Sequence, residues 1–207
     1  LSLCKDSPDG SVMRSLLTGL DAAARAMRAC PVPVVVACQG AAIAGGCALV
    51  AASDITIADR NAKLGYPVVL LGISPAVSAS TLVPRIGPGA ARSRMLDPGL
   101  LPGTKALQVG LVHELVEQPD GVGPRALEVA RTIASKPAQA MAATKHWLNI
   151  LEQAAFSAQT APMPQRSDRD ETEPQAGSDG LVVSLNLTGS VEEQNLLAAY
   201  WTHRGSK

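Results

Sequence analysis

The stretch Gln39–Ala76, QGAAIAGGCALVAASDITIADRNAKLGYPVVLLGISPA, decides how the rest of the chain is interpreted. Gly40 suits a tight turn, and Gly45-Gly46 introduces CALVAAS, a run of small and apolar residues that favour a helix. This order is typical of a strand, a glycine turn and a helix start. The first N–H groups of such a helix lack an intrahelical acceptor, so they would polarise a carbonyl oxygen placed beside Gly45. The stretch therefore predicts an oxyanion-type site made of main chain, although glycines at helix starts more often serve packing alone.

Apolar segments on both sides of this stretch predict an alternation of helices and strands. Val12 to Ala29 places its apolar residues on one face at helical spacing. Val34 to Ala37 is a continuous apolar run of the kind buried in a parallel sheet, and Asp54 to Ala58 is expected to be a second strand. A helix from Gly45 to about Ala52 joins these strands. Repeated β-then-α units favour an α/β protein with a largely parallel sheet.

The rest of the chain divides into further helical segments and one segment of different composition. We expect an α/β core over residues 1–120 and a helical region over 121–207, with an exposed linker near 160–180 that is rich in Pro, Ser and acidic residues. Ser190 and Glu193 have capping-box spacing before a terminal helix, which docks either on its own chain or on a neighbouring subunit. The other expected elements are helices over Pro88–Leu96, Thr104–Val109, Arg125–Ser135 with Pro124 at the first helical position, and Pro137–Ala158, and a strand over Leu111–Val116.

Composition argues against several classes of protein. The 207 residues carry 18 basic and 18 acidic side chains and only 2% aromatic residues, so nothing in the balance favours nucleic acid or an anionic membrane. No apolar run reaches the roughly 18 residues that a membrane span needs. The four cysteines form no C-x-x-C pair, and no zinc spacing, nicotinamide fingerprint or P-loop is present, so we expect no metal or redox cofactor. Buried thiols in a reducing compartment are the preferred interpretation, and the expected location is cytoplasmic.

A series of motifs in family order resembles one known family. The stretch Gln39–Ala76, followed by LVPRIG at 82–87 and ALQVGLVHELV at 106–116, is similar to the signature of the enoyl-CoA hydratase/isomerase family, the crotonase superfamily. The resemblance implies a spiral of ββα units with a trimerising helical tail, and a homotrimer or dimer of trimers. It also implies an acyl-CoA thioester as ligand, with coenzyme A as part of the substrate and no permanently bound cofactor. In the family, strands that precede the position of Leu1 contribute a second oxyanion N–H, so we expect the natural polypeptide to begin earlier.

The resemblance also identifies two positions that carry the family's proton transfers. Its hydratases use one glutamate three residues after the oxyanion-hole glycine and a second after the proline of an AKFG-like element. Two carboxylates are needed because one acts as base toward water while the other supplies a proton to the α-carbon. Here Ala48 and Val68 occupy these positions, and Ala76 stands nearest to an aspartate used by other branches. None of the three side chains can exchange a proton.

The candidate site therefore consists mainly of main chain and small side chains. Gly45 is its backbone oxyanion donor. Its substrate-binding residues are Ala42, Ala48, Tyr66, Pro67, Val68, Ser74 and Ser78. Tyr66 is expected either to hydrogen-bond an acyl group or to form a pocket wall, and the two serines more often cap a turn or helix than act directly.

Three other polar residues receive structural interpretations. Asp97, which precedes Pro-Gly, is more typical of a turn than of a catalytic acid. His113 is expected to be structural or solvent-facing. Lys145 is expected to be a solvated lysine rather than a phosphate ligand.

The resulting hypothesis is a family member that binds an acyl-CoA thioester and stabilises its enolate through a backbone oxyanion hole, without the usual glutamate pair. Whether it is an enzyme stays open. The alternative is a non-catalytic acyl-CoA binding or scaffold protein, and a third hypothesis is an interaction subunit that uses only the fold. Turnover of short unsaturated acyl-CoA would favour the first hypothesis, and saturable binding without turnover would favour the second. The sequence leaves the acyl chain and the exact oligomeric state open.

Overall fold

The computed structural model describes residues 9–160, 185 and 188–204, so most of the predicted linker lies outside the described residues. The α-helices are α1 (Ser11–Ala29), α2 (Gly45–Ala52), α3 (Ala79–Ile86), α4 (Pro88–Leu96), α5 (Gly103–Gln108), α6 (Val122–Ala134), α7 (Ala138–Thr160) and α9 (Val191–Arg204). The strands are β1 (Val35–Cys38), β2 (Ala41–Ile43), β3 (Ile55–Asp59), β4 (Lys63–Gly65), β5 (Leu101–Pro102) and β6 (Glu114–Val116). Three 3₁₀ segments are η2 (Pro67–Leu71), η3 (Pro75–Ser78) and η4 (Pro119–Gly121). No helix in the described part of the chain is long and apolar enough to span a membrane.

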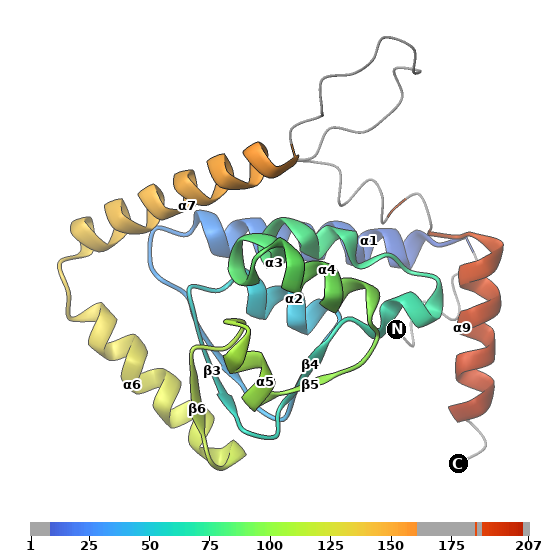
Figure 1. Cartoon of the computed structure of the whole chain (residues 1–207), viewed down its shortest axis with the longest axis horizontal. Coiled ribbons are helices and arrows are strands. Elements are labelled where there is room, and N and C mark those ends of the chain that lie inside the picture. Colours follow the sequence, from blue (N-terminus) through green and yellow to red (C-terminus); the bar gives the residue numbers. More distant parts are fainter. Residues whose placement is uncertain (1–8, 161–184, 186–187, 205–207) are drawn as a thin grey trace, which may run out of the picture.

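Two three-stranded sheets form the centre of the fold (Figure 1). In the first sheet, β3 lies between β1 and β6 and is parallel to both. In the second, β4 lies between β2, which is parallel to it, and β5, which is antiparallel. β1 lies in the first sheet and β2 in the second, and the helix α2 follows. β3 and β4 repeat this order before the helical segment η2. This arrangement confirms the α/β class and is the beginning of the ββα spiral that the resemblance implies.

Most predicted helices are found close to the predicted positions, whereas the short strands are not. α1 and α2 begin within one residue of the prediction. β2 and β4 were not predicted, because three residues are too few to show a period. The predicted strand Leu111–Val116 is wrong at its start, since only Glu114–Val116 pairs with β3. α6 begins at Val122, so Pro124 is its third residue, where a missing N–H still costs no intrahelical bond.

Buried apolar side chains form two main clusters that meet at Leu20. The first, here called the α2 cluster, includes Cys47, Ala48, Leu64, Tyr66 and Leu82. The second, the α9 cluster, consists of Met13, Leu17, Leu71, Ile73, Val77 and Leu197. Leu20 of α1 packs against both clusters. Burial of these side chains therefore fixes α1 against α2 on one side and against η2 and α9 on the other.

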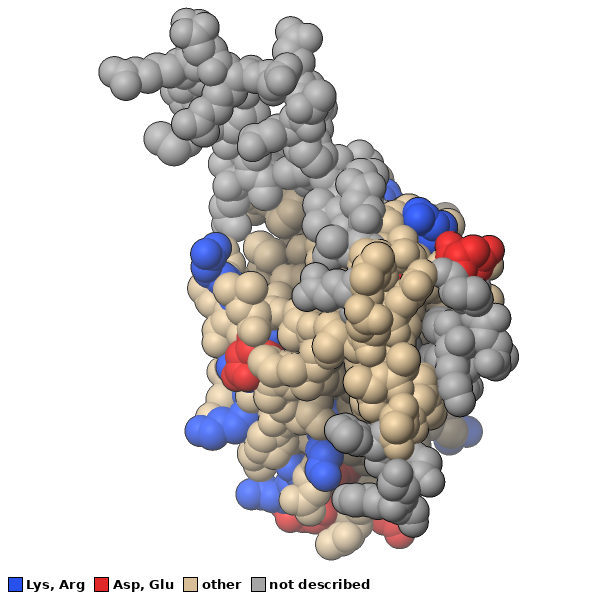
Figure 2. Space-filling view, turned by 90° about the vertical axis from the view of Figure 1, so that its right-hand side faces the viewer, with Lys and Arg blue, Asp and Glu red and all other residues tan. Residues whose placement is uncertain are grey.

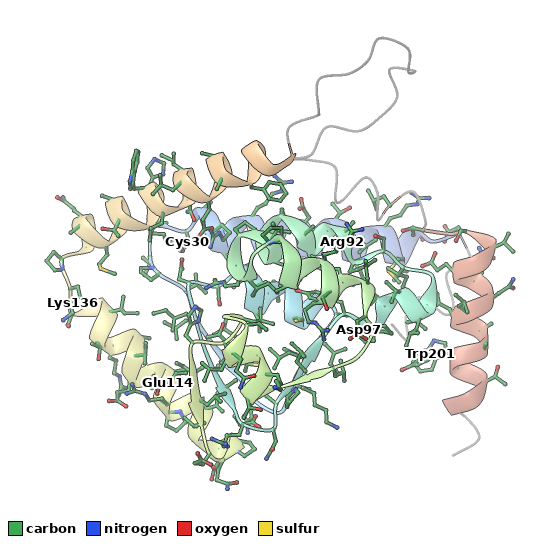
Figure 3. The ribbon with its side chains drawn as sticks, in the orientation of Figure 1. Cys30, Arg92, Asp97, Glu114, Lys136 and Trp201 are labelled. Carbon is green, nitrogen blue, oxygen red and sulfur yellow. The ribbon has the colours of Figure 1, made fainter. Side chains whose placement is uncertain are left out.

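The terminal helix docks on its own chain. α9 stands beside η2 at the end of the molecule opposite α6 (Figure 1). The contact is closest at Gly72, which has φ of +72° and where an added Cβ would lie 3.0 Å from the Glu193 Cα. Figure 3 shows that Trp201 projects from α9 toward the body of the molecule. The sequence allows α9 to dock on its own chain or on a neighbouring subunit, and the described residues make the contact within the chain.

The start of α9 has the predicted cap. The Glu193 N–H donates to the Ser190 Oγ at 3.2 Å, and the Glu193 carboxylate accepts from the Gly189 N–H. The guanidinium of Arg14 donates to the carbonyl oxygen of Thr188 at 3.1 Å. These bonds satisfy main-chain groups at the helix start and tie it to α1.

β2 ends in a strained turn. Ala44 has φ of 55° and ψ of −114°, and it is the one non-glycine residue with positive φ in the described part of the chain. These angles are close to those of the first central residue of a type II′ turn, where glycine is favoured. The conformation is held because the Ala44 N–H donates to the Gly65 carbonyl at 2.8 Å and the Ala44 carbonyl accepts from the Ala48 N–H at 3.0 Å. The chain thereby passes directly from β2 into α2.

A buried lysine anchors α7. The Lys145 Nζ donates to the Asp54 Oδ2 at 2.7 Å. It also donates to the carbonyl oxygens of Met27 and Val32 at 2.9 and 3.1 Å. Lys145 is 6% exposed, so the prediction of a solvated lysine is wrong. Its ammonium ties α7 to the connection between α1 and β1.

Replacing Lys145 by methionine should lower the free energy of unfolding by about 3 kcal/mol, because the Asp54 carboxylate would stay largely buried without its cation. Urea unfolding followed by circular dichroism measures the loss. The control is Lys136→Met, which changes an exposed lysine before α7 and should alter stability by no more than about 0.5 kcal/mol. Equal losses in the two variants would show that the buried ion pair is not the cause.

Ala44→Gly should raise the free energy of unfolding by about 1 kcal/mol, since glycine adopts positive φ without the steric penalty that alanine carries. Thermal unfolding gives the comparison. Ala51→Gly removes the same methyl from the interior of α2 and should lower stability by at least about 1 kcal/mol. The strain assignment is wrong if both variants melt below the parent protein.

Candidate active site

The first turn of α2 is the part of the predicted site that is made of main chain. Gly45 and Gly46 open this helix, and the Gly45 N–H has no acceptor among the residues that the structure describes. Gly45 is half-buried and Gly46 is exposed, so the turn reaches the surface. A methyl group added at Gly45 would meet the Leu20 side chain at 3.6 Å, an ordinary contact, so packing alone does not demand glycine there. N–H groups of this kind attract a negatively polarised oxygen.

β4 holds Tyr66 beside this turn. β2 and β4 end side by side, because the Ala44 N–H is bonded to the Gly65 carbonyl. Tyr66 follows Gly65 directly and is 1% exposed. Its hydroxyl lies close to the thiol of Cys47, the third residue of α2, and to the hydroxyl of Ser78. The carboxyl ends of two parallel strands therefore bring Tyr66 and the α2 turn together, as is common in α/β sites.

The titratable groups beside the turn are both protonated near neutral pH. Burial raises the pKa of Tyr66 well above 10, the Cys47 thiol adds to the increase, and Ser78 opposes it. Burial also raises the pKa of Cys47 to about 11, against the opposing effects of the Tyr66 hydroxyl and the Gly65 N–H. A protonated phenol and a protonated thiol serve as hydrogen-bond donors, not as bases or nucleophiles.

The side chains of Ala48 and Val68 lie in different surroundings. Ala48 is 2% exposed and belongs to the α2 cluster. Val68 is half-buried in η2 and packs against the α9 cluster. Leu20 contacts both clusters and is the side chain that connects them. Both residues therefore contribute apolar surface, and neither side chain can exchange a proton.

Ala42 and Pro67 lie on the segments that flank the turn, β2 and η2. Ala42 is buried on β2, and its Cβ lies 3.8 Å from where a Cβ on Gly46 would be. Pro67 begins η2 immediately after Tyr66 and is half-buried. Both residues are therefore near the α2 turn, and neither offers a side-chain polar group.

The two serines of the predicted site have different roles. The Ser74 Oγ accepts the Ala76 N–H at 3.2 Å, so Ser74 caps η3 as the capping interpretation predicts. Ser78 precedes α3 but makes no capping hydrogen bond through its side chain. Its hydroxyl lies near Tyr66 instead. Ser78 is therefore the serine that borders the candidate site.

The carboxylates of Asp59 and Asp97 accept hydrogen bonds that stabilise turns. Both oxygens of the buried Asp59 are used, because they accept the N–H groups of Gly40 and Asn61 at 2.7 and 3.0 Å. Asp97 is exposed and accepts the Gly99 N–H at 2.9 Å, which is the predicted turn. That bond is the main cause of its lowered pKa. The lowered pKa of Asp97 is the opposite of the raised pKa that a general acid needs near neutral pH.

His113 is structural, as predicted. Its Nδ1 accepts the Thr56 N–H at 2.9 Å, and its Nε2 lies 2.8 Å from a guanidinium nitrogen of Arg85. Burial lowers the pKa of His113, and the charge of Arg85 lowers it further. The ring is therefore neutral near pH 7 and completes the main-chain bonding before β6.

Charges are interspersed on the face shown in Figure 2. Basic and acidic side chains occur there in small separate groups around a surface of other residues, so this face presents no large field of one sign. Within the described ranges, no three His, Cys, Asp or Glu side chains are grouped in a way that would hold a metal ion.

Sequence reasoning missed two residues that shape the site. Ala44 was not singled out, because alanine gives no signal for positive φ; only its place between a strand and a glycine pair hinted at a turn. Leu20 was assigned to packing, and nothing in the pattern of α1 indicates which residue of α2 it contacts. The conformation of Ala44 and the contacts of Leu20 both depend on packing between elements that are distant in the sequence.

Comparisons with known proteins agree with this architecture. The family model described as Enoyl-CoA hydratase/isomerase matches residues 12–167. A crotonyl-CoA hydratase of Syntrophomonas wolfei is 37% identical over 113 residues, which cover 54% of this chain and 43% of that protein. The (7aS)-7a-methyl-1,5-dioxo-2,3,5,6,7,7a-hexahydro-1H-indene-carboxyl-CoA hydrolase of Mycobacterium tuberculosis is 36% identical over 135 residues, covering 65% of this chain and 53% of that protein. The chain spans about half the length of the curated relatives it matches.

Solved structures have the same fold. An enoyl-CoA hydratase/isomerase from Xanthobacter autotrophicus Py2 has a TM-score of 0.71 and 26% identity, with 89% of this chain and 62% of that one covered. A putative enoyl-CoA hydratase from Mycobacterium avium paratuberculosis K-10 has a TM-score of 0.75 with 96% and 71% covered, and at 21% identity the likeness shows the fold alone. Because the family model matches well over half of the 207 residues, the chain belongs to the enoyl-CoA hydratase/isomerase family.

Proposed function

We propose that this chain binds an acyl-CoA thioester with the thioester carbonyl oxygen at the Gly45 N–H. The observation that carries the proposal is that this N–H, in the first turn of α2, has no acceptor among the described residues. Its position at the end of β2 agrees with where α/β proteins bind ligands. Membership of the enoyl-CoA hydratase/isomerase family supports an acyl-CoA as the ligand.

The proposed chemistry is stabilisation of the thioester enolate by the main chain. One well-placed donor contributes about 3 kcal/mol to an oxyanion, which corresponds to a rate factor on the order of 100. Ala48 and Val68 offer no carboxylate to position water or to move a proton. The expected reaction is therefore slow exchange of an α-proton, with solvent water as the proton acceptor and donor, rather than efficient hydration.

A second candidate function is non-catalytic binding of acyl-CoA. The same two aliphatic residues favour it, because binding needs the oxyanion donor and apolar surface but no proton transfer. In either case coenzyme A enters as part of the ligand, and no permanently bound cofactor is proposed.

The proposed assembly is a homotrimer or a dimer of trimers, as the family resemblance implies. Support comes from α7, whose outer face exposes large apolar side chains. Trp147 is 59% exposed, and Leu148 and Leu151 are 53% and 48% exposed. Apolar side chains gathered in this way are typical of a contact surface.

Isotope-edited infrared spectroscopy tests the proposed site directly. Crotonyl-CoA labelled with ¹³C at the thioester carbonyl should show a lower C=O stretching frequency when bound, because hydrogen bonding weakens that bond. Coenzyme A without an acyl group should bind more weakly. Incorporation of deuterium at the α-carbon of butyryl-CoA in D₂O would favour the catalytic function, and binding without exchange would favour the second. Absence of any binding preference for the thioester would refute both.

Gly45→Ala should weaken the binding of crotonyl-CoA about tenfold, since the methyl group would take up room beside the N–H at which the thioester oxygen is proposed to bind. The melting temperature should not fall, because alanine favours the helix. Gly46→Ala makes the same helix-favouring change, and its added Cβ would lie 3.8 Å from the Ala42 Cβ. This variant should bind crotonyl-CoA with an affinity within about twofold of the parent protein's. Calorimetric titration of both variants provides the measurement, and identical affinities would contradict the position assigned to the thioester.

A further inference from the structure

Tyr66 is the largest fully buried side chain in the described part of the chain, and its hydroxyl oxygen has no hydrogen-bond partner there. Buried polar atoms without a partner are rare in proteins, and a buried tyrosine hydroxyl usually finds one. The nearby Cys47 and Ser78 influence the pKa of Tyr66, but neither contact has the geometry of a hydrogen bond. Phenylalanine would fill the same space in the α2 cluster without leaving an unsatisfied group. The hydroxyl therefore calls for an explanation other than packing.

The position of the hydroxyl suggests its acceptor. Tyr66 directly follows Gly65, whose carbonyl oxygen is bonded to the Ala44 N–H at 2.8 Å. The hydroxyl reaches Cys47, which is in the same first turn of α2 as Gly45. Two donors thus lie at one turn: the Gly45 N–H opens α2, and the Tyr66 O–H lies beside Cys47, two residues further along the helix. Neither has an acceptor in the described part of the chain.

We propose that the Tyr66 hydroxyl donates a hydrogen bond to the carbonyl oxygen of the bound thioester, as the side-chain partner of the Gly45 N–H. This inference rests on the proposed function and names a second donor for it. Because the phenol stays protonated near neutral pH, its role is donation and not proton abstraction. The hydrogen bond moves no proton in the ground state and strengthens as negative charge develops on the oxygen.

Tyr66→Phe separates this role from packing, because it removes the hydroxyl and keeps the ring. The free protein should melt about 2–4 °C higher, since a buried unsatisfied group is lost. The affinity for crotonyl-CoA should fall about tenfold, and the decrease in the carbonyl stretching frequency on binding should become smaller. Higher stability together with weaker polarisation is a combination that a purely structural tyrosine would not give.

Tyr200→Phe is the matched control, because it removes the hydroxyl of the other tyrosine, on α9. It should leave the carbonyl frequency of bound crotonyl-CoA unchanged. The inference is overturned if Tyr66→Phe binds crotonyl-CoA with the affinity and carbonyl frequency of the parent protein. It is also overturned if Tyr66→Phe melts lower than the parent, which would mean that the hydroxyl is already satisfied. Failure of the parent protein itself to prefer the thioester over coenzyme A is a different result, and it refutes the proposed function.

Discussion

The hydrogen bond from the Ala44 N–H to the Gly65 carbonyl joins the two strand ends on which the candidate site depends. It sets where α2 begins and where the chain leaves β4, so it fixes the distance between Gly45 and Tyr66. A neutral hydrogen bond contributes about 1 kcal/mol, whereas positive φ at a residue such as Ala44 costs about 1–3 kcal/mol. The bond alone does not outweigh the strain. Burial of the α2 cluster must supply the difference, and the turn therefore exists only in the folded chain.

Main-chain and side-chain parts of the site depend on the sequence in different ways. The donor at Gly45 is created by strand pairing and by the helix that follows, so many sequences that keep the fold will keep it. Proton transfer, in contrast, depends on single side chains, and Ala48 and Val68 are aliphatic. A fold can thus be retained while the reaction changes or is lost.

The helices and the longer strands could be predicted because their periods extend over enough residues. α1 shows one apolar face over 19 residues, and α2 begins at the predicted glycine. β2 and β4 could not be predicted, since each has three residues and is defined by its partner. The start of α2 at Gly45 followed from local pattern. The surroundings of Tyr66 and Lys145 did not, because burial of a polar side chain is decided by residues distant in sequence.

The three hydrogen bonds of Lys145 have a chemical consequence for its reactivity toward thioesters. Thioesters acylate amines, and the attacking nitrogen needs a free lone pair. The Lys145 nitrogen donates three hydrogen bonds, to one carboxylate and two carbonyl oxygens, and the side chain is only 6% exposed, so an acyl donor cannot approach this nitrogen. Exposed lysines such as Lys136 have no comparable protection. Non-enzymatic acylation by reactive acyl donors would therefore modify exposed lysines and leave Lys145, which anchors α7, unmodified.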